Sequence, residues 1–389
     1  MKNKEKIILD VIESIGAIIV WLFFVFLLYE RGYRDNYSPI LLGIVSLFYS
    51  GSIALFNGIF PNLIAEKKEK VFMFLALIMQ GIATISIQFV HHIALVIIIT
   101  LIQGISFSAL SEAKKLILIR NNYIFNDEFI FKLFRMVGPM LAGIMAAILS
   151  EKTRVLYVSA LAVVGSFLIV ILNEKGMEKQ SEIRRGAAEN HHLEMDDIHY
   201  NPYTLIGLSC VLTFCIQVVD AQLITVFKNV ENLGIEMIGI CIGCSGIGVF
   251  LISIFFEQKI KSIMVYMSSV ICMGIVLLVG GTYLIDANYL SGYLLMCLFF
   301  CGGVFWQISM TFLENMIKSV SDEEKRNSLF GVVGICTLIT YSLGAAISGL
   351  FVLIFGIGKV YLLLGCAILL GTVVTFILNV KWKSKLTRV

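Results

Sequence analysis

Long apolar runs alternate with short polar segments along the whole chain, and this pattern predicts helices that cross a membrane. A helix needs about 20 mainly apolar residues to span the hydrocarbon core, and twelve runs of about this length occur in the sequence. The first six extend from Ile8 to Tyr29, Ser38 to Phe60, Val71 to Val90, Ile93 to Leu118, Phe129 to Leu149 and Val155 to Leu172. The other six extend from Tyr203 to Phe227, Ile235 to Phe256, Ser262 to Leu284, Tyr289 to Ile317, Leu329 to Ile354 and Lys359 to Val380.

One long polar segment separates the two sets of six runs. Between Glu174 and His199 it carries seven acidic and four basic residues and no apolar run longer than two residues, a composition typical of a solvated linker. The sequence therefore predicts an all-α membrane protein of 12 transmembrane helices. We expect a six-helix bundle over residues 1–172, a cytoplasmic linker over 173–202 and a second six-helix bundle over 203–389, with pseudo-two-fold symmetry between the bundles.

Composition supports this class of protein. Hydrophobic residues make up 58% of the chain and charged residues 15%, and the mean hydropathy is +0.91, whereas soluble domains average roughly 45–50% apolar and about 25% charged residues. All nine cysteines lie in the second half, in or beside apolar runs, which argues against a secreted disulfide framework. We interpret the pair Cys241 and Cys244 as small residues on a helix and not as a redox or metal motif.

The distribution of basic residues predicts the orientation, because cytoplasmic loops are rich in Lys and Arg. If both termini are cytoplasmic, six of the 30 basic residues lie outside, namely Arg31, Arg34, Lys152, Arg154, Lys228 and Lys359. We therefore expect a multi-pass protein of the plasma membrane with both termini and the linker in the cytoplasm. Ser38-Pro39 and Asn201-Pro202 are typical of helix starts, with a capping residue before a first-turn proline.

The two halves repeat one another in part, as in transporters built from repeats. The fifth run carries Gly138-Pro-Met-Leu-Ala-Gly143, and the eleventh carries Gly344-Ala-Ala-Ile-Ser-Gly349 with the same glycine spacing. The fourth and tenth runs each lead from glycine to an acidic and then a basic residue. These repeats support two related six-helix halves.

With these features the chain resembles the major facilitator superfamily over essentially its full length. Residues 138–143 are similar to the exporter-type motif of that family, a Gly-Pro pair followed by a glycine, although Ala142 stands where a second glycine is common. In the family this motif marks drug and proton antiporters. The resemblance therefore implies an exporter.

Two further motifs of the family are present with changes. Residues 58–68 are similar to the signature between the second and third spans, but Asn62 replaces the usual aspartate, Ala65 the second glycine and Glu66 a base. The fourth run keeps Gln103-Gly104 of its own motif, with Thr100 in place of the common arginine.

The resemblance implies a secondary active transporter that exports small amphipathic or hydrophobic molecules by alternating access and is driven by protons. Two alternatives remain open. One is uptake or exchange of a polar solute by the same fold; the other is a transporter-like membrane sensor or immunity protein that does not transport. The expected partners are a small-molecule cargo, protons and the lipid bilayer, and we expect a monomer without a cofactor.

No pattern in the sequence indicates an enzyme. A Gly-x4-Gly-Lys-Ser/Thr phosphate loop is absent from the sequence. The linker histidines lie in a segment whose composition predicts solvation, and His91 and His92 in a short turn lack further visible ligands, so we predict no metal site. Basic residues gather at membrane edges and the linker is net acidic, which gives no basis for nucleic-acid binding.

Several residues of the first half are candidates for conformational change. Glu112 and Arg135 lie at equal depth in adjacent predicted spans, and charges at such depth are costly unless they pair or are hydrated, so we predict an ion pair between them. The alternative is that both extend separately to the cytoplasmic surface. Pro139 removes a backbone hydrogen bond in mid-span, and Gly138 and Gly143 allow another helix to approach. These three residues predict a pliable contact; the alternative is that they merely pack.

Asp220 is the predicted proton or cation site. It is the only acidic residue well inside a span of the second half, and an isolated carboxylate there is disfavoured unless it binds a proton or finds a partner. Gln217, one turn earlier, is expected to donate a hydrogen bond to it. The alternatives are a static ion pair with Lys228 or a position in the outer vestibule. Trp306 and Gln307 in the tenth span are the other predicted cargo-binding residues.

Overall fold

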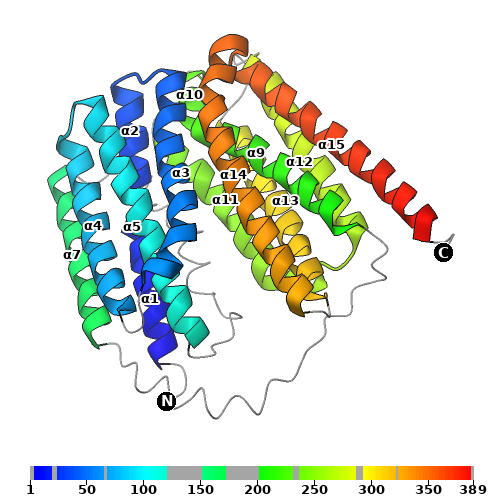
Figure 1. The fold of residues 1–389 in the computed structure, drawn as a ribbon. Coiled ribbons are helices and arrows are strands. Elements are labelled where there is room, and N and C mark those ends of the chain that lie inside the picture. Colours follow the sequence, from blue (N-terminus) through cyan, green and yellow to red (C-terminus); the bar gives the residue numbers. More distant parts are fainter. Residues whose placement is uncertain are drawn as a thin grey trace. The chain divides into compact units, whose positions relative to one another are not determined.

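The structure is a computed structural model that describes residues 4–19, 24–64, 68–120, 151–171, 201–230, 236–285, 292–320 and 323–386. In these ranges the chain is helical (Figure 1), and nine helices are long and apolar enough to cross a membrane. The predicted fold class, an all-α membrane protein, is confirmed. The predicted span Phe129–Leu149 and almost all of the predicted linker lie outside the described residues.

The chain divides into two compact units, residues 1–36 with 47–190 and residues 37–46 with 191–389. The helices of the first unit are α1 (Lys4–Ile18), α2 (Phe26–Arg34), most of α3 (Pro39–Leu63), α4 (Glu69–Phe89), α5 (Ile93–Arg120) and α7 (Glu151–Ile171). Within this unit α4 packs against α5 and α7, and α1 packs against the same two helices. The core of the first unit therefore lies among α1, α4, α5 and α7.

The first predicted span is described in two parts. The sequence predicts a single span over residues 8–29, and the structure has α1 up to Ile18 and α2 from Phe26 to Arg34. Ile19, Phe24 and Val25 are π-helical, and residues 20–23 lie outside the described residues. The helical geometry on both sides of this gap is compatible with the predicted span, and α2 extends beyond the predicted end at Tyr29.

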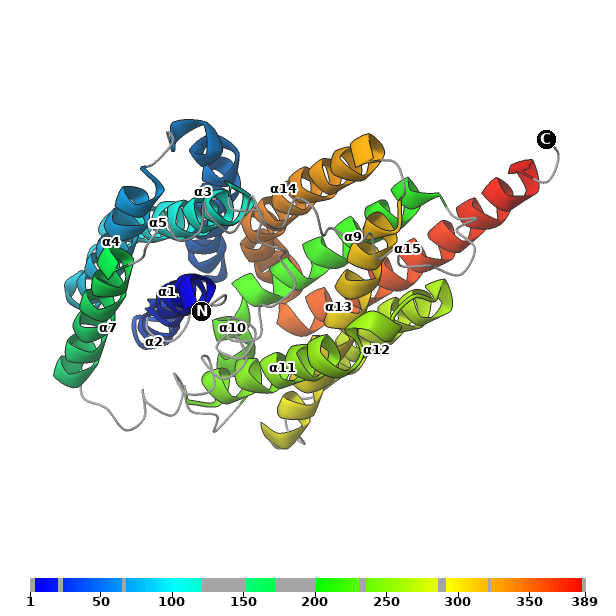
Figure 2. The ribbon, with the colours of Figure 1, turned by 90° about the horizontal axis from the view of Figure 1, so that it is seen from below.

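The second unit contains the remaining helices. They are α9 (Pro202–Ala221), α10 (Leu223–Lys228), α11 (Glu236–Phe255), the short 3-10 helix η2 (Glu257–Lys259), α12 (Ile263–Ile285), α13 (Gly292–Lys318), α14 (Glu323–Phe355) and α15 (Ile357–Leu386). The closest neighbours are α12 with α15, α11 with α13, and α9 with α14, as the second view also shows (Figure 2). The first turns of α3 belong to this unit.

Glycines set the closest helix crossings of the second unit. A Cβ on Gly303 of α13 would lie 2.0 Å from the carbonyl oxygen of Ser245 on α11, and one on Gly248 would lie 2.6 Å from the carbonyl oxygen of Phe300. Neither position has room for a side chain. Without a side chain the two backbones approach closely, as is common between membrane helices.

Both predicted helix starts are confirmed. α3 begins at Pro39, and the Oγ of Ser38 accepts a hydrogen bond of 3.3 Å from the backbone N–H of Leu41. α9 begins at Pro202, and the Oδ1 of Asn201 accepts one of 3.0 Å from the backbone N–H of Tyr203. Each side chain satisfies an N–H group of the first turn, which has no partner within the helix.

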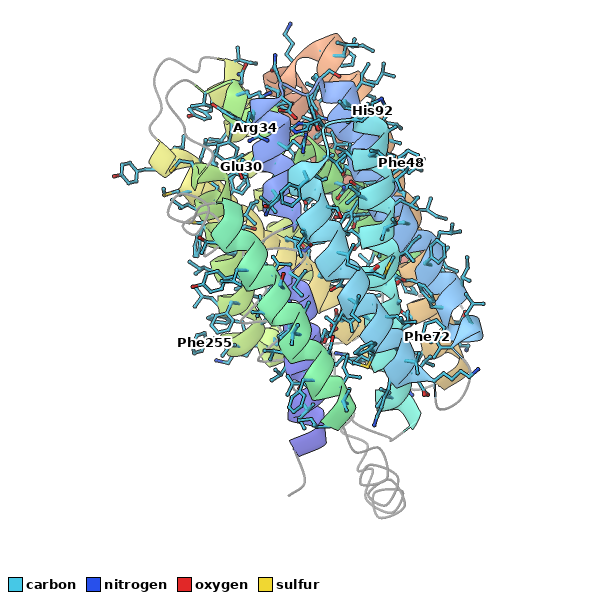
Figure 3. All side chains as sticks on the ribbon, turned by 90° about the vertical axis from the view of Figure 1, so that its left-hand side faces the viewer. Glu30, Arg34, Phe48, Phe72, His92 and Phe255 are labelled. Atoms are coloured by element: carbon cyan, nitrogen blue, oxygen red, sulfur yellow. The ribbon has the colours of Figure 1, made fainter. Side chains whose placement is uncertain are left out.

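Apolar side chains also cover outward surfaces, as expected for contact with lipid. On α7, the green helix in front in Figure 3, Val163, Phe167 and Val170 are 68%, 64% and 71% exposed. In a soluble protein such a continuous patch marks an interface. The apolar part of α7, Leu156–Ile171, is shorter than a full span, and its exposed apolar side chains fit contact with the hydrocarbon core of a bilayer.

Candidate functional site

The seventh predicted span is interrupted where the sequence predicts the ion site. α9 ends at Ala221 and α10 begins at Leu223, so Gln222 lies between two helices. The Gln222 side chain is fully buried, and its Nε2 donates to the carbonyl oxygen of Pro39 (2.9 Å) and to the Oγ of Ser348 (3.1 Å). Its Oε1 accepts from the Oγ1 of Thr225 (3.1 Å). The side-chain amide of Gln222 therefore connects the break between α9 and α10 to residues on α3, α14 and α10.

Asp220 lies in the last turn of α9, just before this break, and its side chain is half-buried. The hydroxyl of Tyr361 on α15, a residue that is only 7% exposed, lies within range of the charge on the carboxyl group of Asp220. Carbonyl groups at the C-terminus of a helix carry partial negative charge and disfavour a carboxylate. Binding a proton would remove this repulsion, and a role of Asp220 as a proton or cation site stays a prediction.

Gln217 does not donate to Asp220, so this part of the prediction is wrong. Its Nε2 donates instead to the Oγ of Ser46 on α3 (3.1 Å), and its buried Oε1 has no hydrogen-bond partner in the part of the chain that the structure describes. The physical reason is the close approach of α3 and α14 to this face of α9. The side chain of Gln217 turns toward these helices and away from its own helix end.

The repeated glycines of the eleventh span allow this approach. A Cβ on Gly344 would lie 2.8 Å from the carbonyl oxygen of Phe214 on α9 and 3.0 Å from the Cβ of Gln217. A Cβ on Gly349 would lie 2.4 Å from the carbonyl oxygen of Pro39. The spacing noticed in the sequence therefore corresponds to two backbone contacts of α14, one with α9 and one with α3.

Trp306 and Gln307 lie on α13 and are both half-buried. The Nε2 of Gln307 donates to the Oγ1 of Thr311, one turn further along the same helix (3.1 Å). One turn away from Trp306 on α13, the Oγ of Ser309 is 2.8 Å from the Oγ of Ser269 on α12. A role of Trp306 and Gln307 in cargo binding stays a prediction.

The other predicted gating residues are described only in part. Glu112 is 7% exposed and forms an ion pair with Lys115 of the same helix. Arg135, Gly138, Pro139 and Gly143 lie outside the described residues, as does the side chain of Asn62 in the last turn of α3. The Glu112–Arg135 pair therefore stays a prediction.

Two acidic residues of α1, Asp10 and Glu13, form ion pairs inside the first unit. Lys114 of α5 is 4% exposed, its Nζ lies 2.9 Å from the Oδ1 of Asp10 on α1, and it also forms an ion pair with Glu13. Asp10 is 6% exposed. The single positive charge of Lys114 offsets one of the two negative charges, and this ion pairing explains why Asp10 can be buried.

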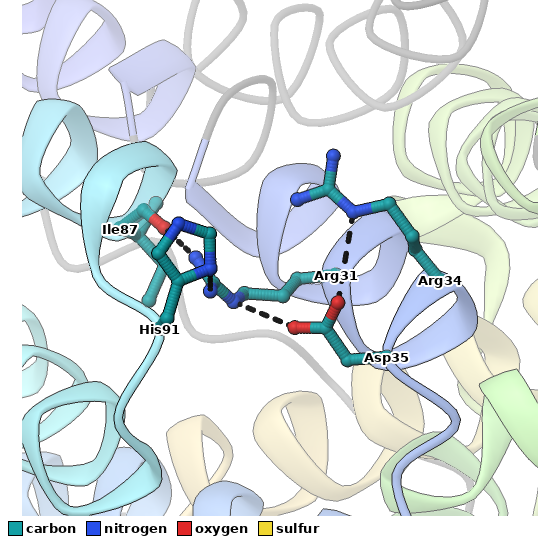
Figure 4. Close-up of polar contacts among 5 residues, drawn as sticks. All are labelled: Arg31, Arg34, Asp35, Ile87 and His91. Carbon is teal, nitrogen blue, oxygen red and sulfur yellow. Dashed lines mark hydrogen bonds and ion pairs between the residues drawn. The ribbon is translucent and has the colours of Figure 1, made fainter.

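The opposite end of the first unit has a second buried charge, Arg31 at the end of α2 (Figure 4). Its Nε lies 3.0 Å from the Oδ2 of Asp35, its Nη1 donates to the carbonyl oxygen of Ile87 (2.8 Å), and its Nη2 lies 2.9 Å from the Nδ1 of His91. Arginine cannot accept a hydrogen bond, so His91 must accept at Nδ1. This cluster ties α2 to the end of α4.

The sequence alone does not reveal the buried contacts of four residues, namely Gln222, Arg31, Lys114 and Tyr361. For Gln222 a signal existed, since Gln217, Asp220 and Gln222 crowd three polar groups into one apolar run. For Arg31 and Lys114 the partners lie 56 to 104 residues away in the chain, and a single sequence does not show such pairs.

In the described residues no group of three or more His, Cys, Asp or Glu side chains could hold a metal ion. The buried features that remain are ion pairs, amides and helix interruptions within long apolar helices. Together with the nine candidate spans they fit a multi-pass membrane protein, in which interrupted spans and intramembrane charges mark functional positions.

Comparison with known proteins identifies this architecture. No protein-family model matches the chain. The chain is 21% identical to YfiS of Bacillus subtilis (strain 168), an uncharacterized MFS-type transporter, over 382 residues that cover 94% of this chain and 91% of the relative. The relative is a transporter and not an enzyme, in agreement with the sequence prediction.

Solved structures show the fold. The crystal structure of the nucleoside transporter NupG matches with a TM-score of 0.72 and 12% identity, covering 96% of this chain and 98% of NupG. The human organic anion transporter MFSD10 (TETRAN) matches with a TM-score of 0.61 and 11% identity, covering 96% of this chain and 99% of that protein. The protein therefore has the fold of major facilitator superfamily transporters.

Proposed function

We propose that the protein is a secondary active transporter that exports small amphipathic or hydrophobic molecules in exchange for protons. The observation that carries the proposal is Asp220, a carboxyl group in the last turn of α9 at the interruption of an apolar span. Interrupted spans with polar side chains are where transporters bind substrates and coupling ions. The likeness to MFS-type transporters in sequence and fold supports transport by alternating access.

Asp220 has the chemistry that proton coupling needs. In its charged form the carboxylate faces the partial negative charge of the α9 C-terminus; in its protonated form it is a neutral hydrogen-bond donor. The two forms interact differently with Tyr361 and with the helix end, so proton binding can favour one conformation over another. We also propose that both termini and residues 173–202 are cytoplasmic, and that residues 1–172 and 203–389 form the two six-helix bundles.

Uptake or exchange of a polar solute is the second candidate function. The fold of NupG, a nucleoside transporter, favours it, as does the Oε1 of Gln217, which is buried without a hydrogen-bond partner among the described residues. A polar cargo would meet that oxygen with a donor, whereas an apolar cargo would not. The same fold can carry cargo in either direction. The two candidates therefore differ in the cargo and in whether protons flow with it or against it.

Reconstituted vesicles with an imposed pH gradient test the proposal. We expect the wild-type protein to move a dye or drug from a panel of amphipathic cations against its concentration gradient while protons flow in the opposite direction. A nucleoside and a sugar serve as polar comparison cargoes. Gradient-driven flux of the polar cargoes together with protons would favour uptake. A protein that binds cargo but moves none of the panel would instead support a transporter-like sensor.

A further inference from the structure

Two glutamines of the first unit are fully buried, and their side-chain amides have no hydrogen-bond partner among the described residues. Gln80 of α4 and Gln103 of α5 are each 0% exposed, and in both side chains neither the Nε2 nor the Oε1 has a partner among the described residues. Nearly all buried polar groups in proteins are hydrogen-bonded. A buried amide with both of its atoms unmet therefore indicates a bound species that satisfies it.

Gln80 faces α1, and Gln103 lies on the stripe of α5 that meets α1 at Lys114. The Oε1 of Gln80 would lie 3.1 Å from a Cβ on Gly16, so Gln80 faces α1. Gln103 lies eleven residues, or about three turns, before Lys114 on α5. It therefore shares the stripe of α5 from which Lys114 reaches Asp10 on α1. Gly16 lies six residues after Asp10, about 9 Å along the axis.

The chemistry of an amide identifies the occupant. A metal ion would leave the Nε2 donor unmet and an anion would leave the Oε1 acceptor unmet, whereas water donates and accepts. A fully buried threonine lies one turn from each glutamine, Thr84 near Gln80 and Thr100 near Gln103. Each threonine donates its hydroxyl to its own helix backbone, to the carbonyl oxygens of Gln80 and Val96 respectively. The hydroxyl oxygen can still accept, which gives a buried water the further partner it needs.

We propose that Gln80 and Gln103 bind internal water, and that this water extends the Asp10–Glu13–Lys114 cluster into the first unit as a route for protons. The inference rests on the proton coupling proposed above. An amide does not exchange protons readily, so the glutamines hold the water, and a proton moves from one water to the next. At the cluster the proton would reach the carboxylate of Asp10 or Glu13. Asp220 lies in the other unit, so this route is separate from it.

Gln80→Met and Gln103→Met test the proposal, because methionine keeps the length of the side chain and removes both polar atoms. Radiolytic hydroxyl labelling reports bound water through oxidation of neighbouring side chains, here Leu77 and Leu110, which both lie beside Gly16. We expect the wild-type protein to be labelled at these leucines and Gln80→Met to lose at least fivefold of that labelling. Gln80→Asn, which keeps the amide, should retain most of it.

Proton flux provides the second measurement. In vesicles with a pH gradient and no cargo gradient, we expect each methionine variant to move protons across the membrane at least fivefold more slowly than the wild type. The rate of cargo exchange at equal pH on both sides should stay unchanged. If no water binds the two amides, Gln80→Met raises the melting temperature and changes neither the labelling of the leucines nor the proton flux. That result would overturn the proposal. Lost labelling with unchanged proton flux overturns the route. Labelling is independent of transport, so wild-type vesicles that fail to couple protons would contradict the proposed function without removing the water site.

Discussion

Arg31 shows how a single buried residue can connect two helices of the first unit. It is 3% exposed, and its three contacts are with Asp35, the carbonyl oxygen of Ile87 and His91. The neighbouring Arg34 is 53% exposed and lies 3.6 Å from the same carboxylate. The two arginines have the same chemistry but opposite environments. Burial therefore decides which of them contributes to stability.

Replacement of Arg31 by methionine should destabilise the protein by about 2 kcal/mol, because the carbonyl oxygen of Ile87 and the carboxylate of Asp35 lose their donor. The matched variant Arg34→Met should cost less than about 1 kcal/mol, since exposed ion pairs contribute little. Thermal unfolding in detergent measures both. Equal shifts of the melting temperature for the two variants would show that the Arg31 cluster does not hold α2 to α4.

At the scale of helices, the sequence predicts where the spans start but not where a span is interrupted. The starts of α3 and α9 follow from Ser38-Pro39 and Asn201-Pro202, because capping and proline chemistry are local. The break at Gln222 has no proline or glycine to mark it. It is held by hydrogen bonds to Pro39 and Ser348, which are distant in the chain, and its stabilisation is therefore tertiary.

Gly303→Ala tests the glycine crossing of α11 and α13. The added Cβ would meet the backbone oxygen of Ser245 at 2.0 Å, so the helices must separate, and we expect a loss of about 1–3 kcal/mol. The control is Gly334→Ala on α14, where a Cβ would meet nothing within 4 Å. That change should be neutral or stabilise by about 0.5–1 kcal/mol, since alanine favours a helix. Equal melting temperatures for both variants would contradict close packing at Gly303.

At the scale of the whole molecule, hydropathy is sufficient to predict the fold class, and the candidate site is predictable only in part. Asp220 stands out in the sequence as a candidate because an acidic residue is rare in an apolar span, and its role stays a prediction. Its neighbour Gln217 was assigned the wrong acceptor, because Ser46 lies on a different helix, 171 residues away in the chain. Likewise Asp10 and Glu13 look like solvated residues until Lys114 is placed beside them.

Alternating access gives Glu112 and Arg135 a testable role as a cytoplasmic latch. If they pair only in the outward-open state, Glu112→Gln and Arg135→Gln should each shift the population toward the inward-open state about fivefold or more, for a pair that contributes about 1 kcal/mol or more. Labelling of a cysteine introduced at the inner mouth, in a variant without the native cysteines, measures the shift. Lys115→Gln is the control, because Lys115 pairs with Glu112 within one helix. Labelling unchanged in both test variants would exclude the latch.

The most direct test of proton-coupled export is Asp220→Asn, measured in one vesicle preparation for both gradient-driven accumulation and cargo exchange at equal pH. Asparagine keeps the shape of the side chain and can hydrogen-bond, but it cannot release a proton. We predict that the variant exchanges cargo at a rate within about twofold of the wild type and no longer concentrates it, since coupling requires two protonation states with different conformational preferences. Uphill accumulation by Asp220→Asn with an unchanged pH dependence would contradict the assignment of Asp220 as the coupling residue.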